Sequence, residues 1–319
     1  MKVSIVITTR NRSDDLRRAL TSCYTQRGID LEVLVYDDAS TDNTSEIVST
    51  EFPDARVVQV QERVGLIVLR NRGFREATGD YVVSIDDDAY FTSATTVRDA
   101  VEMLRENSDA AAIALPYVEP RTKDPARLIS SISPGEKVRS YVGCAHLIKR
   151  DIALSMGGYR EFFVHQGEER DLAIRMLEKG YGIIMGGTPP IVHDYSPKRE
   201  VARMSYYGTR NTLLFAVLNL PFSAAILRLC LDSINLFRHK LTFGGIPAQC
   251  LLIGRSLVAC LWFIRFRDPV SLSTYRLFRS LPRHGPYSCA DYNLPDDVDV
   301  LRQQVFAEQN KSSGATVPS

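Results

Sequence analysis

The sequence predicts an α/β protein with a doubly wound, mostly parallel sheet and a C-terminal helical extension. Short strands rich in apolar and β-branched residues alternate with helical segments over the first part of the chain. Two of these strands run directly into aspartate pairs or triplets. Open sheets of this kind bind ligands at the carboxyl ends of their strands, so the two observations together predict a ligand-binding edge.

The first predicted strand, VSIVIT at residues 3–8, is apolar almost throughout, as expected for a strand buried on both faces. Ser13 is the expected N-cap of the next helix, with Asp14 and Asp15 in its first turn. The same alternation continues along the chain. We expect further strands at 31–36, 56–60, 81–85, 110–115, 141–149 and 183–185, and helices between 65 and 79 and at 94–107, 150–156 and 172–179.

The chain is predicted to divide into three parts: the sheet domain at 1–200, a basic and apolar helical extension at 201–290, and a disordered polar tail at 291–319. Within the first part, 116–140 is rich in proline and reads as a mobile excursion over the site. Residues 213–231 and 251–266 read as long apolar helices that arginines interrupt, so they fit a membrane span poorly. Two interpretations of these helices remain: they lie on a membrane surface, or they form a soluble helical lid over the core.

The charge is unevenly distributed although the formal net charge is only +1. Residues 198–283 contain thirteen basic and three acidic side chains, so this segment carries +10. The asymmetry suggests contact with a polyanion or an anionic membrane surface, and we expect no nucleic-acid partner. The six cysteines form no C-x-x-C pair, and the N-terminus does not resemble a signal peptide. We therefore expect a cytoplasmic protein, peripheral at the inner face of the cell membrane.

The triplet Asp86, Asp87 and Asp88 follows the strand 81–85 and is the clearest pointer to chemistry. Three adjacent carboxylates repel one another and need a cation or hydrogen-bond donors to stay ionised. Along an extended backbone the first and third side chains point to the same side and can converge on one ligand. Oxygen ligands favour Mg²⁺ or Mn²⁺. The alternative is a solvated acidic turn that caps the next helix.

Several enzyme classes are excluded by missing motifs. The chain has no G-x-G-x-x-G after the first strand, no phosphate-binding P-loop and no H-E-x-x-H. These absences argue against nicotinamide oxidoreductases, P-loop kinases and zincin proteases. The remaining acidic strand ends and the cluster Glu168, Glu169 and Asp171 suit a phosphate-bearing donor whose leaving group a cation neutralises.

Four runs occur in a fixed order: VSIVITTRNR, VLVYDDASTDNT, LRNRGFREATGDYVVSIDDDA, and GGYREFF followed by GEERDLAIRMLEKGY. Together they resemble the family 2 inverting glycosyltransferases of the GT-A fold, over about the first 200 residues. The likeness is greatest to bacterial members that build surface polysaccharides, including rhamnosyltransferase-like enzymes. It implies metal-dependent transfer of a hexosyl or deoxyhexosyl group from a nucleoside-diphosphate sugar to a saccharide or lipid-linked acceptor.

The resemblance also implies roles at the nucleotide end of the site. Thr8 and Arg10 would line the nucleotide pocket. Asp38 would hydrogen-bond the base, with Asp37 as its structural partner. Arg70 would lie near the nucleotide, and a simple surface charge on its helix is the alternative.

At the metal end, the family's D-x-D motif matches Asp86 and Asp88. Asp86 would lie near the ribose and Asp88 on the Mn²⁺ or Mg²⁺ ion, while Asp87 could share the contact with the nucleotide. His193, in the run VHDYSP, falls where relatives place a histidine that reaches the metal or the diphosphate. A histidine that is merely packed in the core is the alternative.

The family's catalytic base corresponds to Glu169, with Glu168 as the neighbouring candidate and Asp171 as a further residue on the acceptor side. Acids at a helix N-terminus are also favoured by the helix dipole, so plain first-turn residues are the alternative. One base suffices because a sugar nucleotide leaves as a metal-bound diphosphate and needs no acid, unlike a glycosidase substrate. A nucleotidyltransferase and a non-catalytic carbohydrate- or membrane-binding module are the rival functions.

Overall fold

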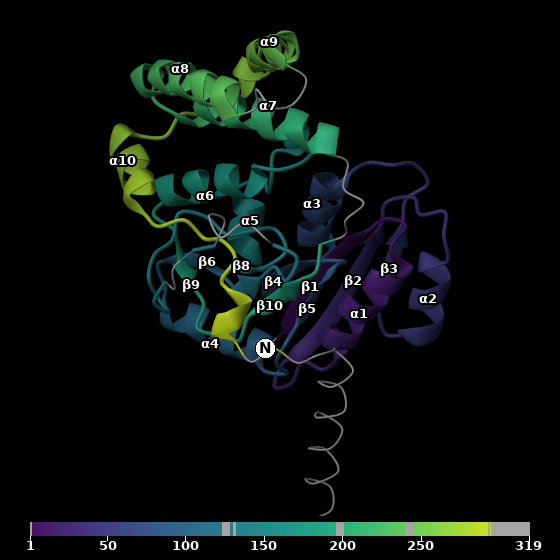
Figure 1. Ribbon diagram of the computed structural model, residues 1–319. Coiled ribbons are helices and arrows are strands. Elements are labelled where there is room, and N and C mark those ends of the chain that lie inside the picture. The colour runs from purple at the N-terminus through teal and green to yellow at the C-terminus, as the bar shows by residue number, and fades with distance from the viewer. Residues whose placement is uncertain are drawn as a thin grey trace, which may run out of the picture.

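A seven-stranded sheet forms the centre of the computed structural model, which describes residues 2–122, 128–129, 132–195, 201–239, 245–292 and 294 (Figure 1). Nearly all of the predicted tail at 291–319 lies outside these residues. The strand order within them is β3-β2-β1-β4-β8-β6-β9. All neighbours are parallel except β8, which runs antiparallel to β4 and β6. The predicted mostly parallel α/β sheet is therefore confirmed. The strands are β1 (Lys2–Thr9), β2 (Asp30–Asp37), β3 (Arg56–Gln59), β4 (Tyr81–Asp86), β6 (Ala110–Ala114), β8 (His146–Lys149) and β9 (Gly182–Met185).

Helices cover both faces of the sheet, and this explains why its strands are apolar almost throughout. In β1, Ile5 and Ile7 belong to one core and Val6 to the other, because successive side chains point to opposite faces. The first core includes α1 (Ser13–Tyr24), α2 (Thr44–Glu51) and α4 (Thr96–Glu106). The second includes α3 (Leu66–Glu76), α5 (Arg150–Ser155) and α6 (Glu168–Glu178), which lie on the opposite side in Figure 1.

A second, three-stranded sheet brings distant segments to the end of β4. Its central strand β10 (Ile191–His193) pairs antiparallel with β5 (Ala89–Phe91) and parallel with β7 (Tyr117–Val118). His193 lies opposite Ala89 in this register, one residue beyond the aspartate triplet. The small sheet therefore determines which side chains surround the triplet.

The C-terminal helices α7 (Val201–Asn219), α8 (Phe222–His239) and α9 (Gly245–Phe263) form a layer above α6 (Figure 1). Residues Leu213 to Leu218 of α7 are buried, and α7 packs on α6. The helix α10 (Leu272–Ser280) also packs on α6, and Tyr287 then donates a backbone hydrogen bond to Tyr117 in β7. The extension thus returns to the sheet domain at both α7 and Tyr287.

Three predicted elements differ from the structure. The helix expected at 213–231 is two helices, because Pro221 has no N–H and cannot continue the first. The strand expected at 141–149 begins only at His146, since 142–145 form a turn closed by the Ala145 to Val142 backbone hydrogen bond. The helix expected at 172–179 begins at Glu168, so the acidic cluster lies in its first turn.

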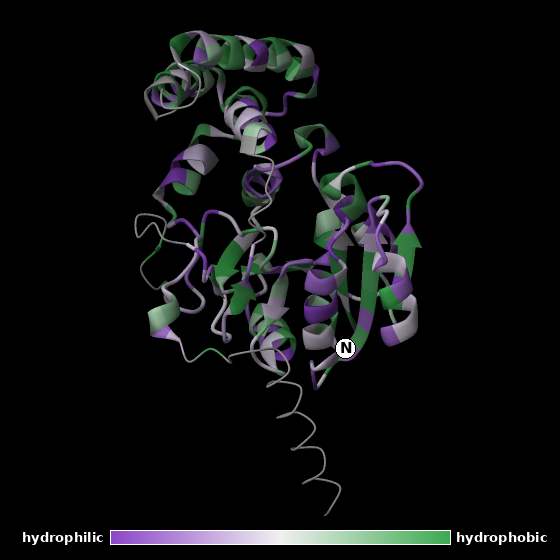
Figure 2. Ribbon diagram, turned by 45° about the vertical axis from the view of Figure 1, so that its right-hand side comes forward, coloured by the Kyte–Doolittle hydropathy of each residue, from purple (hydrophilic) through white to green (hydrophobic). Residues whose placement is uncertain are grey.

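The helix region Gly245–Phe266 meets the length and hydropathy required of a membrane span, with a mean hydropathy of 1.6. This differs from the expectation that 251–266 fits a membrane span poorly because arginines interrupt it. Only 17% of the most apolar 18-residue window in this stretch is buried in the protein. The neighbouring α8 also exposes large apolar side chains, so this end of the molecule presents an apolar surface. Figure 2 colours much of the ribbon of these helices as hydrophobic. The exposed apolar residues of the two helices include Phe222, Ile226, Leu227, Leu231, Ile234, Leu251, Val258, Leu261 and Trp262.

Candidate active site

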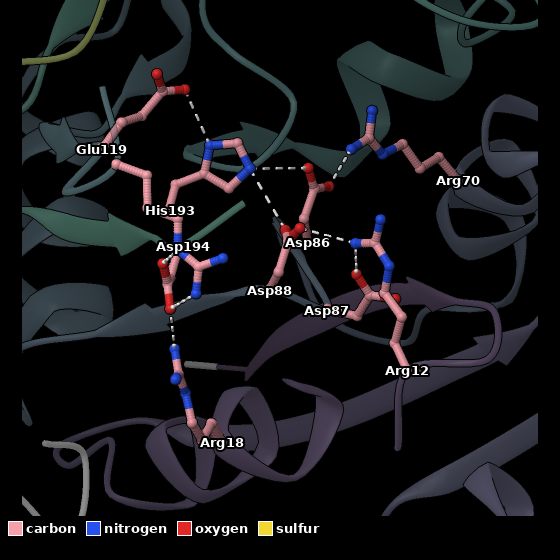
Figure 3. Close-up of polar contacts among 10 residues, drawn as sticks. Arg12, Arg18, Arg70, Asp86, Asp87, Asp88, Glu119, His193 and Asp194 are labelled. Atoms are coloured by element: carbon pink, nitrogen blue, oxygen red, sulfur yellow. Dashed lines mark hydrogen bonds and ion pairs between the residues drawn. The ribbon is translucent and has the colours of Figure 1, made fainter. Parts of the chain in front are cut away.

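The aspartate triplet lies at the carboxyl end of β4, but its backbone is not extended. The strand ends at Asp86, and Asp87 and Asp88 form the turn into β5. The strict alternation expected for the three side chains is therefore wrong. Arg12 reaches into this turn, and its Nη1 donates to Asp87 Oδ1 at 2.8 Å and to Asp88 Oδ2 at 2.7 Å (Figure 3). The sequence did not identify Arg12, which supplies the charge that lets two of the three carboxylates coexist.

Asp87 is buried and differs from its two neighbours. Burial raises the pKa of Asp87 to about 7, against the opposing effect of Arg12. Its side chain contacts Arg12 in the loop after β1, whereas Asp86 and Asp88 each direct one oxygen toward His193 (Figure 3). The second oxygen of Asp88 accepts the hydrogen bond from Arg12. The first and third carboxylates thus converge, as predicted, although the turn rather than strand alternation brings them together. A nucleotide contact by Asp87 stays a prediction.

His193 lies between three carboxylates. Its Nε2 is 3.4 Å from Asp88 Oδ1 and 3.9 Å from Asp86 Oδ2, and its Nδ1 is 3.2 Å from Glu119 Oε1 (Figure 3). Burial alone would lower the pKa of His193, but Cys144 and the hydrogen bonds to Asp88 and Glu119 raise it. Glu119 fixes the ring orientation so that Nε2 points toward the aspartates. No sequence signal pointed to Glu119, because only the pairing of β7 with β10 brings it to His193.

The donor atoms of Asp86, Cys144 and His193 all lie within 4.8 Å of one another, which fits three ligands of one cation. Octahedral ions such as Mg²⁺ hold neighbouring ligands roughly 3 Å apart, with bonds of about 2.1 Å. Carboxylate oxygens suit Mg²⁺ and Mn²⁺, while the imidazole extends the set toward transition ions. Asp88 Oδ1 is directed at the same imidazole. These residues could therefore hold a divalent cation, and Cys144 is a member of the cluster that sequence reasoning missed.

Arg70 is buried on α3 and connects the two acidic clusters of the site. Its side chain is only 5% exposed. One terminal nitrogen donates to Asp86 Oδ1 at 2.6 Å and the other to Glu168 Oε1 at 3.2 Å, with Glu169 Oε1 at 4.0 Å. The alternative of a surface helix charge is therefore wrong. Arg70 holds the end of β4 and the first turn of α6 in a fixed relation.

The two candidate bases occupy different environments. The Glu168 side chain is 2% exposed, whereas that of Glu169 is 17% exposed and lines a cavity. Burial raises the pKa of both, for Glu168 to about 8 with repulsion by Glu169 adding to the shift, while Arg70 opposes it. Arg70 and Glu169 both lie against Gly143, and only a glycine leaves room for them. A Cβ at this position would lie 2.6 Å from Arg70 Nη1 and 2.7 Å from Glu169 Oε1. Of the two, Glu169 is the one that lines this cavity.

Asp171 is fully buried and is not part of the lining of the cavity beside Glu169. Its buried carboxylate accepts hydrogen bonds from Arg160 at 2.8 Å, Arg175 at 3.0 Å and Asn219 Nδ2 at 2.8 Å. These partners come from α6 itself, from α7 and from the segment before η2 (Glu161–Phe163). We infer that Asp171 ties α6 to its neighbours, in place of the acceptor role expected from the sequence.

The residues expected at the nucleotide end lie at the same edge of the sheet. Thr8 pairs with Asp86 in the β1–β4 register, and Arg10 is exposed in the loop that follows. Asp37 is fully buried and accepts hydrogen bonds from the Ser40 N–H, the Ser45 hydroxyl and the Gln59 amide, which suits its expected structural role. The nearby Asp38 accepts from the backbone N–H groups of Val64 and Gly65 just before α3. Its contact with a base stays a prediction.

A cavity of about 600 Å³ lies between α6 and the helices α7, α8 and α10, and Glu169 is part of its wall. Tyr141 and Gln166 border it near Glu169. The opposite wall comes from the C-terminal helices, including Arg228 and Arg279. The helical extension therefore builds a space next to the candidate base.

None of the six cysteines, all in the described part of the chain, forms a disulfide.

Comparison with known sequences finds a match over residues 4–163 to the model of a family described as glycosyl transferase family 2. An uncharacterized glycosyltransferase YibD of Escherichia coli is 39% identical over 101 residues, which cover 30% of this chain and 29% of that protein. The pre-mycofactocin glycosyltransferase of Mycobacterium tuberculosis is 29% identical over 231 residues, covering 65% and 46%. The succinoglycan biosynthesis protein ExoO of Rhizobium meliloti is 34% identical over 112 residues, covering 34% and 30%. The matches thus span less than half of each curated relative.

Solved structures resemble this chain in fold. Staphylococcus aureus TarS 1–349 in complex with UDP-GlcNAc has a TM-score of 0.64 at 16% identity, covering all of this chain and 93% of that one. The mannosyltransferase PcManGT of Pyrobaculum calidifontis, in complex with GDP-Man and Mn²⁺, has a TM-score of 0.55 at 22% identity, covering 83% of each chain. The family match includes half of the present chain, with the acidic ends of β2 and β4 inside it. The chain therefore belongs to glycosyl transferase family 2 and has the GT-A fold.

Proposed function

We propose that this protein is an inverting glycosyltransferase. It transfers a hexosyl or deoxyhexosyl group from a nucleoside-diphosphate sugar to a hydroxyl of a saccharide or lipid-linked acceptor, in surface polysaccharide synthesis. The observation that carries the proposal is the arrangement around Arg70, which joins Asp86 at the metal end to the first turn of α6. There Glu169 faces the cavity and can meet an acceptor. The name of the relative ExoO and the nucleotide sugars named with TarS and PcManGT support the substrate classes.

In this proposal the donor binds at the carboxyl ends of β1, β2 and β4. Thr8, Arg10 and Asp38 lie there for the nucleoside, and Asp86, Asp88 and His193 lie together for a Mn²⁺ or Mg²⁺ ion. A bound divalent cation would neutralise the diphosphate and make it a good leaving group. Glu119 orients the His193 ring, and Arg12 fixes the loop that carries Asp88. These residues would hold the donor at the edge of the sheet, from which Arg70 leads to Glu169 in the cavity wall.

Glu169 then acts as the general base. It accepts the proton of the acceptor hydroxyl while the oxygen attacks the anomeric carbon from the face opposite the diphosphate. The new glycosidic C–O bond forms as the bond to the diphosphate oxygen breaks, so the configuration at the anomeric carbon is inverted. The raised pKa of Glu169 places its protonation equilibrium closer to neutral pH, where proton transfer is most effective.

The substitution Glu169→Gln tests this role. We expect transfer to fall by at least about a hundredfold, within the range typical of general-base removal. Release of nucleoside diphosphate from a panel of nucleoside-diphosphate sugars with Mn²⁺ gives the rate, and thermal stabilisation by the same donors reports their binding. Glu102→Gln is the control, since this exposed carboxylate lies on α4, outside the lining of the cavity. Near-normal transfer by Glu169→Gln with intact donor binding would show that another group is the base.

We also propose peripheral association with an anionic membrane. The apolar outer faces of α8 and α9 would enter the lipid boundary, and the exposed Arg255 and Arg265 would meet anionic head groups. Co-sedimentation with phosphatidylglycerol vesicles at low salt should exceed that with phosphatidylcholine vesicles and decrease as salt is added. Equal binding to both lipids would contradict the electrostatic part. Resistance to extraction at alkaline pH would instead indicate that Gly245–Phe266 spans the bilayer.

A further inference from the structure

The cavity beside Glu169 has an unusual charge. Its described lining contains five arginines and two carboxylates, a formal excess of three positive charges. The arginines come from separated parts of the chain: the segment before β8, α6, α8, α10 and the segment after α10. They are Arg139, Arg170, Arg228, Arg279 and Arg283. Bringing five like charges to one cavity costs free energy, so their convergence calls for a compensating anion.

The two carboxylates do not compensate this charge. Asp232 pairs bidentately with Arg228, at 2.7 and 2.9 Å, and its single charge also acts on Arg170. Glu169 lies nearest to Arg70, which is not part of the cavity. Arg139 donates to the backbone carbonyls of Phe278 and Leu281, which are neutral acceptors. Most of the positive charge therefore remains available within the described part of the chain.

Arg170 is the innermost of the five. It lies beside Glu169 in sequence, its guanidinium is 4.2 Å from the centre of the Phe215 ring, and its buried Nε makes no hydrogen bond to a described residue. Burial lowers the pKa of Arg170 to about 10, and Arg228 and Arg283 add to this against the effect of Asp232. Burial together with Arg283, Arg279 and Arg228 likewise lowers the pKa of Arg139. The arginines therefore repel one another electrostatically across the cavity.

We propose that this cavity binds a phosphate or diphosphate group of the acceptor and so presents the acceptor hydroxyl to Glu169. The inference rests on the proposed transferase function, because it names the acceptor class for that site. Arginine suits this task, since its fork donates two hydrogen bonds to phosphate oxygens. The cavity lies between the base and the helices with the apolar outer surface. In a diphosphate that joins a saccharide to a lipid, the saccharide would lie toward Glu169, the diphosphate in the cavity and the lipid toward the apolar helices. A phosphate group on the saccharide itself would be bound by the same arginines.

Binding of inorganic pyrophosphate to the full chain, measured by calorimetry in EDTA at low salt, tests the cavity without donor, metal or turnover. We expect the double variant Arg279→Gln/Arg283→Gln to bind at least about tenfold more weakly, since each charge-assisted contact is worth a factor of that order. Both side chains are exposed, so folding should survive. Arg276→Gln, on the same helix but outside the cavity, is the matched control and should bind like the wild type. Arg170→Gln should also weaken pyrophosphate binding and provides a second test from a different helix.

Absence of binding by the wild type, or equal affinity in the wild type and both cavity variants, would overturn the proposal. Geranyl diphosphate and glucose 6-phosphate separate the two sources of the anion: the tighter ligand shows whether the lipid or the saccharide end carries it, and failure of both to bind also overturns the proposal. Since no sugar is transferred in these measurements, they can succeed or fail independently of the Glu169→Gln result.

Discussion

Replacing Arg70 by methionine should destabilise the protein strongly and in a pH-dependent way. The substitution keeps a long apolar side chain but leaves Asp86, Glu168 and Glu169 without the cation that lies 2.6, 3.2 and 4.0 Å from them. Removing one partner from a buried ion pair typically costs about 3–5 kcal/mol. We expect a loss of this size in the free energy of unfolding at pH 8. The site loses its bridge at the same time, so transfer should fall as well.

The pH dependence follows from the carboxylates that Arg70 leaves behind. Burial already raises the pKa of Glu168 and Glu169 above their unfolded values, and Arg70 opposes this rise. Without Arg70 their folded-state pKa rises further. A group whose pKa is raised on folding supports the folded state below its unfolded pKa and loses that contribution as pH increases. The destabilisation by Arg70→Met should therefore grow between about pH 4.5 and pH 8.

Urea unfolding at pH 5.5 and pH 8 measures both effects. Arg72→Met is the matched control, because Arg72 lies on the same helix and pairs with Glu76 at the surface. Surface pairs contribute about 0–1 kcal/mol, so the control should lose little at either pH. A loss for Arg70→Met below about 1 kcal/mol at pH 8, or an equal loss at both pH values, would refute the bridging role derived for Arg70.

Three further results are expected. The rate of transfer should rise with pH through a pKa clearly above that of an ordinary glutamate, because burial raises the pKa of Glu169; a rate that is constant from pH 5 to pH 9 would contradict this. Glu119→Gln should weaken Mn²⁺ binding by about 10–100-fold, since it removes the carboxylate that orients His193; unchanged affinity in a Mn²⁺ titration would count against that role. Asp171→Asn should lower the free energy of unfolding by about 3–5 kcal/mol through its partners Arg160 and Arg175, while donor binding is kept; loss of donor binding in a stably folded variant would argue otherwise.

Much of the sheet could be predicted because its signals are local. The run VSIVIT reads as a doubly buried strand, and the structure places its side chains in two cores on opposite faces. The acidic residues at the ends of β2 and β4 lie at one edge because parallel strands share a direction. By contrast, the length of β8 and the start of α6 depend on neighbours that local propensity does not describe.

The partners of the site residues could not be read from the sequence. Arg12 and Asp87 are separated by 75 positions, and Glu119 and His193 by 74, with no motif linking either pair. From the sequence, Arg70 could be either a surface charge or a residue of the site. The sequence of its helix alone does not show which face is buried against α6. The cavity arginines similarly come from five segments and form a cluster only after α7 and α10 pack on α6 and α8 packs on α7.

The sequence by itself determined the fold class, the family and the acidic strand ends, because strand composition, chain order and motif spacing are written along the chain. The tertiary structure decided which side chains those acids meet: Arg12 at the turn after β4, Glu119 behind His193, and Arg70 between the metal end and Glu169. It also separated Glu169, which faces a cavity, from the buried Glu168. The physical reason is that charge compensation and burial depend on distances across the sheet, which packing of distant segments sets and local sequence does not.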